Sequence, residues 1–313
     1  MSVQVQFKCG KATKRSRYGM TSKDRMKRTL WSAKLCVRAG MSYHVIDSEW
    51  KILYPTPYEV KDLVDHSHGL RTIVTFSTKH HNSLRLLRQT LSGFNALDEI
   101  GLNLVVGNPA YLTERETRRP SIRTLIDSIK FVRKCFNDLM IFIGTEGLIS
   151  RAAQLSVEYD LIPLILLDRG LEEDIATVRD TVRNSEIGLY APFLISENYP
   201  RLLHDVLLRL SGYIMRRSWV REDLRKLGYD LTASTLRAVI QDKKPLPTRI
   251  MRSDLGRFLK KVASSFTIYG NMKEVTERID QIRKLGVTTI IGLPVKENDR
   301  QILSFGRLVS RSI

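Results

Sequence analysis

The sequence has little cysteine, no long apolar run and no secretory leader, and each absence excludes a class of protein. Its three cysteines, Cys9, Cys36 and Cys135, are too few and too scattered for a disulfide framework or a zinc site. No apolar run approaches the ~20 residues that cross a bilayer. Basic residues follow Phe7 so closely that no signal-peptide core fits. The sequence therefore predicts a cytoplasmic protein with no membrane segment and no bound metal.

Acidic residues are also scarce relative to basic ones. The chain has 33 Asp and Glu residues against 51 Lys and Arg residues, which gives a formal net charge of +18. A surplus of this size attracts anions such as nucleic acid, phosphates and polycarboxylates. The basic residues are spread along the chain, and no nucleic-acid-binding motif accompanies them. A solvated basic surface, an anionic cofactor or substrate, and nucleic acid all remain open as explanations.

The sequence does contain one motif that occurs three times: an amphipathic helix, a short turn that stops the helix, and an apolar strand. Gly40 and Gly286 stand at two of the stops, where a helix ends in a left-handed residue that glycine adopts without steric cost. Apolar strands of this kind are typical of parallel sheets buried on both faces. The copies are Trp31–Gly40 into Met41–Ile46, Arg151–Asp160 into Leu161–Leu167, and Val275–Gly286 into Val287–Gly292. The repeat predicts a wound α/β fold.

Eight strands alternating with helices can be counted along the chain. They are Val3–Phe7, Met41–Ile46, Leu70–Phe76, Ile100–Val106, Leu139–Ile143, Leu161–Leu167, Ile187–Ile195 and Val287–Gly292. An open doubly wound sheet would carry a glycine-rich loop after its first strand, but Cys9-Gly10 is followed by a basic run. We therefore predict a single (β/α)8 TIM-barrel domain over 1–313. A helical insertion over about 201–265, beginning with a long helix over Arg201–Leu227, is expected between strands seven and eight.

The segments that carry a family resemblance are Ala33–Trp50, Arg71–Ser77, Asn82–Phe94, Gly101–Gly107, Phe142–Ile149 with Ala152-Ala153, and Val275–Gly286 with Ile290–Pro294 and Phe305-Gly306. They resemble the bacterial luciferase-like flavin and deazaflavin oxidoreductases, in particular methylenetetrahydromethanopterin reductases. The resemblance implies a TIM barrel, often dimeric, that binds the deazaflavin coenzyme F420 or alternatively flavin mononucleotide (FMN) at its C-terminal mouth. It also implies hydride transfer to a small organic substrate, in some members with oxygen.

Two positions depart from the family pattern. Asp47-Ser48-Glu49 stands where Asp-His or Glu-His is usual after the second strand, and Pro109 follows Asn108 where a glycine-rich turn is usual. A non-catalytic barrel of the same ancestry, serving as a binding or scaffold protein, is therefore the alternative to an enzyme. A basic protein associated with nucleic acid is a third hypothesis.

Candidate site residues follow from the rule that ligands of such barrels bind at the C-terminal ends of the strands. Asp47 and Glu49, after the second strand, are the candidate catalytic acid/base residues, because carboxylates in a dry barrel mouth shift upward in pKa. A solvated acid or a structural ion pair is the alternative for both. The same rule selects Asp168, Ser196 and Pro294.

The candidate cofactor-binding residues follow strands three, four and five. Ser77 and Thr78 would support or hydrogen-bond a cofactor ring, although a simple turn at a helix start explains them equally well. Gly107 and Asn108 follow the fourth strand. The Gly144, Thr145 and Gly147 backbone opens a helix and could hold a phosphate, with a plain helix cap as the alternative.

Overall fold

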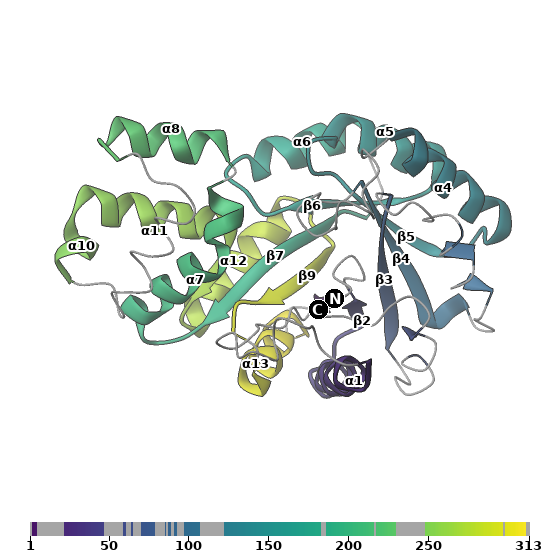
Figure 1. Ribbon diagram of the computed structural model, residues 1–313, viewed down its shortest axis with the longest axis horizontal. Coiled ribbons are helices and arrows are strands. Elements are labelled where there is room, and N and C mark those ends of the chain that lie inside the picture. Colours follow the sequence, from purple (N-terminus) through teal and green to yellow (C-terminus); the bar gives the residue numbers. More distant parts are fainter. Residues whose placement is uncertain are drawn as a thin grey trace.

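Parallel strands surrounded by helices form the centre of the molecule (Figure 1). The computed structural model describes residues 2–4, 22–46, 59–60, 64, 70–78, 85, 87–88, 91–92, 97–106, 122–182, 186–215, 217–229, 248–296 and 298–310. All structural statements below concern these residues.

Eight parallel strands pair in a ring. They are β1 (Ser2–Gln4), β2 (Tyr43–Ile46), β3 (Arg71–Ser77), β4 (Ile100–Val105), β5 (Met140–Gly144), β6 (Ile162–Leu166), β7 (Gly188–Ile195) and β9 (Thr289–Pro294). Each pairs with the next in this order, and β9 also pairs with β1. The predicted parallel α/β barrel of TIM type is therefore confirmed. A short additional strand, β8 (Ile268–Gly270), pairs with the end of β7 and was not predicted.

Helices pack around the outside of the barrel. They are α1 (Ser22–Arg38), α4 (Ile122–Cys135), α5 (Ile149–Tyr159), α6 (Leu171–Thr181), α12 (Met272–Lys284) and α13 (Asp299–Ser310), and a 3-10 turn over Leu97–Glu99 precedes β4. Their apolar faces and the outward side chains of the strands form the main hydrophobic core. The predicted left-handed stops are confirmed at Gly40 (φ 70°) and Gly286 (φ 96°), and Asp160 ends the middle copy with φ 52°.

The inside of the barrel is filled by a separate apolar layer. Its buried members, Val45, Ile73, Phe142, Leu164 and Ile291, come from five different strands. Side chains of a strand alternate between its two faces. Residues two and four positions beyond Ile73 therefore also point inward, nearer the C-terminal end of the barrel.

A helical segment covers part of that end. Helices α7 (Tyr199–Ile214), α8 (Ser218–Lys226), α10 (Thr248–Arg252) and α11 (Asp254–Phe266) lie between β7 and β8 in the chain. Leu194 and Val295 share the inward face of Tyr190 and Ile291 by alternation, yet both pack into the apolar cluster of these helices. Figure 1 shows the helices beyond the ends of β7 and β9. We call these four helices, together with Arg217 between α7 and α8, the helical cap.

The structure divides one predicted helix into two. The helix predicted over Arg201–Leu227 is broken, because Arg217 is extended (φ −76°, ψ 124°) between α7 and α8. Polar partners outside the cap hold this residue, as described below. Helices do occupy much of 201–265, but their status as an insertion stays a prediction. In the described part of the chain, no helix combines the length and the apolar composition that a membrane span requires.

Candidate functional site

The described candidates all lie on the C-terminal rim of the barrel. Ser77 and Thr78 end β3, while Gly144, Thr145 and Gly147 follow β5. Asp47, Glu49, Gly107 and Asn108 lie outside the described residues, so the structure brings together only the β3 and β5 candidates. The intervening strand, β4, contributes a residue that was not predicted.

A polar pair lies inside the mouth, between β3 and β4. Thr75 and Asn103 are partners in the register of these strands, and the Asn103 Nδ2 donates to Thr75 Oγ1 over 3.2 Å. Asn103 is only 7% exposed, and its Oδ1 is buried with no hydrogen-bond partner among the described residues. Leaving a buried polar atom unpaired costs about 1–3 kcal/mol. The mouth therefore presents an acceptor that nothing in the described protein satisfies.

Ser77 extends this pair toward solvent. It is the second residue beyond Thr75, so it shares the inward face of β3, and it is almost completely buried. Its hydroxyl makes a long 3.4 Å contact with the Val106 carbonyl, which also accepts from Thr78 Oγ1 at 3.2 Å. The Thr78 N–H donates to the Val105 carbonyl, so Thr78 ties the ends of β3 and β4 together. We refer to Thr75, Ser77 and Asn103 as the mouth cluster.

The turn after β5 forms a second part of the rim. Gly144 faces inward beside Val105, since a Cβ on it would lie 2.8 Å from Val105 Cγ1. Gly147 has φ 71° and open space around it, and the Leu148 N–H donates to the Thr145 carbonyl to close the turn. The hydroxyl of Thr145 donates to the Leu164 carbonyl over 3.1 Å. An anion at this turn would therefore meet backbone N–H groups at the start of α5 rather than the Thr145 hydroxyl proton.

Charged groups surround this turn. Arg217 of the cap lies 3.2 Å from a Glu146 oxygen and 2.9 Å from an Asp168 oxygen. Partial burial, followed by repulsion from Asp168 and Glu173, raises the pKa of Asp174 nearby. Arg217 thus joins the start of α8 to the loops after β5 and β6, and it compensates Glu146 beside the candidate anion site.

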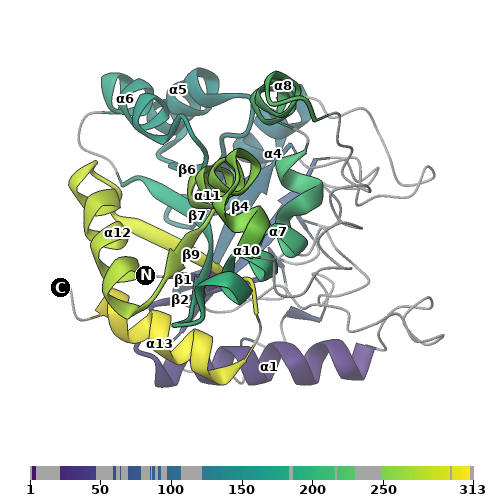
Figure 2. The same cartoon turned by 90° about the vertical axis from the view of Figure 1, so that its left-hand side faces the viewer.

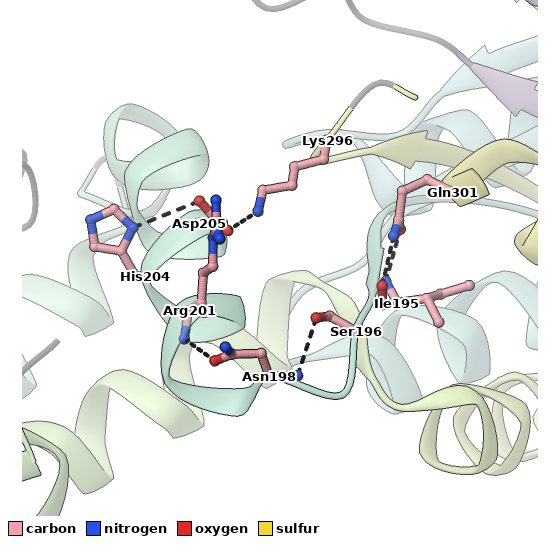
Figure 3. Close-up of polar contacts among 8 residues, drawn as sticks. All are labelled: Ile195, Ser196, Asn198, Arg201, His204, Asp205, Lys296 and Gln301. Carbon is pink, nitrogen blue, oxygen red and sulfur yellow. Dashed lines mark hydrogen bonds and ion pairs between the residues drawn. The ribbon is translucent and has the colours of Figure 1, made fainter. Parts of the chain in front are cut away.

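Polar contacts also fix the cap to the opposite side of the mouth (Figure 3). Lys296, just beyond β9, forms an ion pair with Asp205 of α7, and the adjacent His204 is buried. Gln301 of α13 binds both backbone groups of Ile195: its Oε1 accepts from the N–H at 2.8 Å, and its Nε2 donates to the carbonyl at 2.6 Å. These contacts hold the cap and α13 against the ends of β7 and β9. Among the described residues, no three potential metal ligands cluster.

Sequence reasoning missed Thr75 and Asn103 but contained a signal for them. The alternation that buries Ile73 places Thr75 inside the barrel, and Asn103 is the single amide in the apolar strand Ile100–Val105. An amide at an inward strand position was the available indication. Lys296 and Asp205 carried no comparable signal, because their pairing depends on how the cap folds back.

Comparisons with known proteins place the chain in a family. A family model described as "Family of unknown function (DUF7388)" matches residues 36–301. A search of curated proteins found no match.

Several solved structures similar to this chain are oxidoreductases. An F420-dependent secondary alcohol dehydrogenase, in complex with an F420-acetone adduct, superposes with TM-score 0.64 at 9% identity, covering 91% of this chain and 94% of its own. The FMN complex of a type II Baeyer-Villiger monooxygenase, 3,6-diketocamphane monooxygenase from the CAM plasmid of Pseudomonas putida, gives 0.56 at 12% identity and 94% coverage of both chains. EDTA monooxygenase from Chelativorans sp. BNC1 gives 0.55 at 15%, covering 92% and 87%. At these identities the likeness shows the fold, and the resemblance to luciferase-like barrels is confirmed at that level.

Proposed function

Because this chain belongs to DUF7388, a family of unknown function, its chemistry has to be argued from the barrel mouth, and we propose that it is a deazaflavin- or flavin-dependent oxidoreductase. Coenzyme F420 is the proposed cofactor, with FMN as the alternative, and the proposed reaction is hydride transfer to a small organic substrate. The supporting observation is the buried Oδ1 of Asn103, which has no hydrogen-bond partner among the described residues and lies in the mouth of a barrel whose fold is shared with F420- and FMN-containing enzymes.

The residues of the mouth cluster fit the polar edge of such a ring system. A flavin or deazaflavin ring has N–H and C=O groups along its pyrimidine edge and an apolar edge opposite. The Asn103 Oδ1 can accept a hydrogen bond, and the Ser77 hydroxyl, which makes a long 3.4 Å contact with the Val106 carbonyl, can donate one. Beneath them, Ile73 and Phe142 form an apolar floor. When bound, the cofactor would supply the hydride chemistry.

The remaining described residues would position the phosphate-bearing tail and exclude water. The backbone N–H groups that open α5 can bind an anion, and the Arg217 guanidinium offsets the negative charge of Glu146 at that turn. The helical cap seals the β7 and β9 side of the mouth with apolar side chains, including Leu194 and Val295. The proposed insertion over about 201–265 corresponds to most of this cap.

Asp47 and Glu49 remain the proposed acid/base residues, on the sequence alone. β2 ends at Ile46, so Asp47 is the next residue along the chain at the carboxyl end of the strand. Val45 points inward, and alternation continued past β2 would bring Asp47 to the same face. We propose Asp47 as the carboxylate that holds a proton at the substrate oxygen, with Glu49 assisting.

Cofactor titration tests the proposal. The full chain is titrated with coenzyme F420 and separately with FMN, following fluorescence or absorbance, and saturable binding of one of them is expected. Asn103→Leu should weaken that binding at least tenfold, because it removes the unpaired acceptor. Asn137→Leu, the same change in the turn before β5 at the other end of the barrel, should leave binding unchanged.

Two outcomes would reject an enzyme of this kind. If neither cofactor binds saturably, the alternative of a non-catalytic barrel acting as a binding or scaffold protein is favoured. If a cofactor binds equally well to wild type and Asn103→Leu, the cofactor does not occupy the mouth cluster.

A further inference from the structure

Helix α1 exposes charge of one sign. Its sequence contains six basic residues, Lys23, Arg25, Lys27, Arg28, Lys34 and Arg38, and one acidic residue, Asp24. Arg25 is turned toward Glu59, with 3.1 Å between Nη2 and Oε1. Four of the others, Lys23, Lys27, Lys34 and Arg38, are exposed.

These four cations form a single stripe along the helix. At about 100° per residue, they fall within an arc of about 60°, opposite the face that buries Ser32, Cys36 and Ala39. From Lys23 to Arg38 the stripe is about 22 Å long at ~1.5 Å per residue. The spacing therefore places the positive charges in a row rather than scattering them around the helix.

Helix α13 brings a fifth exposed cation near one end of the row. A Cβ on Gly306 would lie 2.4 Å from the Ala39 Cβ, so the two helices cross in close contact there. Arg307 follows Gly306 and is exposed, just as Arg38 precedes Ala39. Figure 2 shows α1 and α13 side by side on one face of the molecule, away from α4, α5 and α6. We call Lys23, Lys27, Lys34, Arg38 and Arg307 the basic ridge.

The ridge is not neutralised within the described part of the chain. None of its five cations has an acidic partner there, whereas Lys226 of α8 pairs with Asp223 and Lys273 of α12 pairs with Glu277. A row of uncompensated charge carries a self-repulsion that an external polyanion would relieve. Such a row is the electrostatic footprint expected of a surface that binds a phosphate backbone.

The observations favour nucleic acid over a lipid surface. A helix that binds a bilayer inserts its apolar face, but the apolar face of α1 is buried in the barrel core. The exposed face of α1 instead carries a row of ammonium and guanidinium groups, on a protein with a net charge of +18. We propose that the basic ridge binds the phosphodiester backbone of nucleic acid, without base specificity, at a surface separate from the barrel mouth.

Fluorescence anisotropy with a labelled 20-base-pair DNA duplex tests this inference on the full chain. Wild type should bind with an affinity that falls steeply with salt. A variant carrying K23Q, K27Q, K34Q and R38Q should bind at least tenfold more weakly at 50 mM salt. The slope of log K against log[salt] should decrease in magnitude by about 3–4, since each duplex phosphate contact contributes about 0.9.

The control removes the same charge elsewhere. A variant carrying R123Q, K130Q, K134Q and R151Q changes four exposed cations of α4 and α5, on the far side of the barrel. It should keep most of the affinity and of the salt slope. Circular dichroism of each variant confirms that the exposed substitutions leave the fold intact.

Three results would overturn the inference. They are no binding of the duplex by wild type at 50 mM salt, equal losses in the ridge and control variants, and competition by polyglutamate as effective as that by unlabelled duplex. Cofactor titration is independent of all three, because the ridge variant retains the mouth cluster.

Discussion

His44 makes the stability of this protein depend on pH in a way that can be calculated. It lies on β2 between the inward-facing Tyr43 and Val45, so its ring points outward toward α1. There its Nε2 lies 2.9 Å from Ser32 Oγ, whose other contact is the Thr29 carbonyl at 2.8 Å. Complete burial lowers the pKa of His44 from 6.5 to about 4. The imidazole is therefore neutral in the folded protein at neutral pH.

The sign follows from comparing the two states. Above pH 7 the ring is neutral in both the folded and the unfolded chain, and His44 causes no pH dependence. Between pH 6.5 and 4 the unfolded chain binds a proton that the folded chain does not, so the free energy of unfolding falls by ~1.4 kcal/mol per pH unit. Over this window the loss reaches about 3 kcal/mol. The stabilisation is complete above pH 6.5 and is lost as the pH falls toward 4.

Urea unfolding of wild type and His44→Gln at several pH values between 8 and 4.5 measures this effect. The glutamine amide can still hydrogen-bond Ser32 but cannot be protonated, so all other titrating groups are common to both proteins. The difference in unfolding free energy between wild type and variant should shrink by more than 2 kcal/mol across the range. Parallel curves would show that His44 is not buried as neutral imidazole.

Three further substitutions test how the rim and the cap are held. Gln301→Ala should lower the unfolding free energy by about 2–4 kcal/mol, measured by urea unfolding, because both backbone groups of Ile195 lose their partner; an unchanged midpoint would contradict the clamp. Arg217→Ala should lower the melting temperature by a few degrees at low salt and by much less at 0.5 M NaCl, since its carboxylate partners are partly exposed. An effect independent of salt would argue against the ionic attachment of α8. Gly286→Ala should cost about 1–3 kcal/mol, because its φ of 96° is strained for alanine and the new Cβ would lie 3.0 Å from the Arg179 guanidinium; a neutral result would contradict that close approach.

The strands of the barrel were predictable because most are short apolar runs, and three of them follow a helix-stop signal. Each of the eight predicted segments overlaps an observed strand, and the stops at Gly40 and Gly286 have the expected left-handed backbone. The apolar strands and the glycine stops depend on residues that are close together in the sequence, so they can be recognised from the sequence alone. The β8 strand escaped prediction because three residues, Ile268–Gly270, form a strand only by pairing with the end of β7.

The break between α7 and α8 could not be predicted for a similar reason. No proline or glycine stands between Ile214 and Ser218, and helical periodicity continues on both sides. Arg217 is held by Glu146 and Asp168, which are distant in sequence and come close only when the cap covers the rim. Tertiary contacts thus override the local pattern. The same dependence hid Asn103, because only the folded barrel shows that its Oδ1 is buried with no hydrogen-bond partner in the part of the chain that the structure describes.

The mouth cluster makes a prediction that separates a binding site from a merely structural barrel. In a barrel that only has to be stable, inward positions 75 and 103 would be filled by apolar residues, as the layer formed by Ile73 and Phe142 is. An amide oxygen with no partner among the described residues lowers the stability of the protein by about 1–3 kcal/mol. Such a loss is retained in a protein where the oxygen is needed to bind a ligand. A Thr75→Val, Asn103→Leu double variant should therefore melt at a higher temperature than wild type without ligand. It should also show no stabilisation when the cofactor that stabilises wild type is added. Calorimetry of both proteins with and without cofactor measures the two effects, and a double variant that is both less stable and still cofactor-responsive would refute the argument.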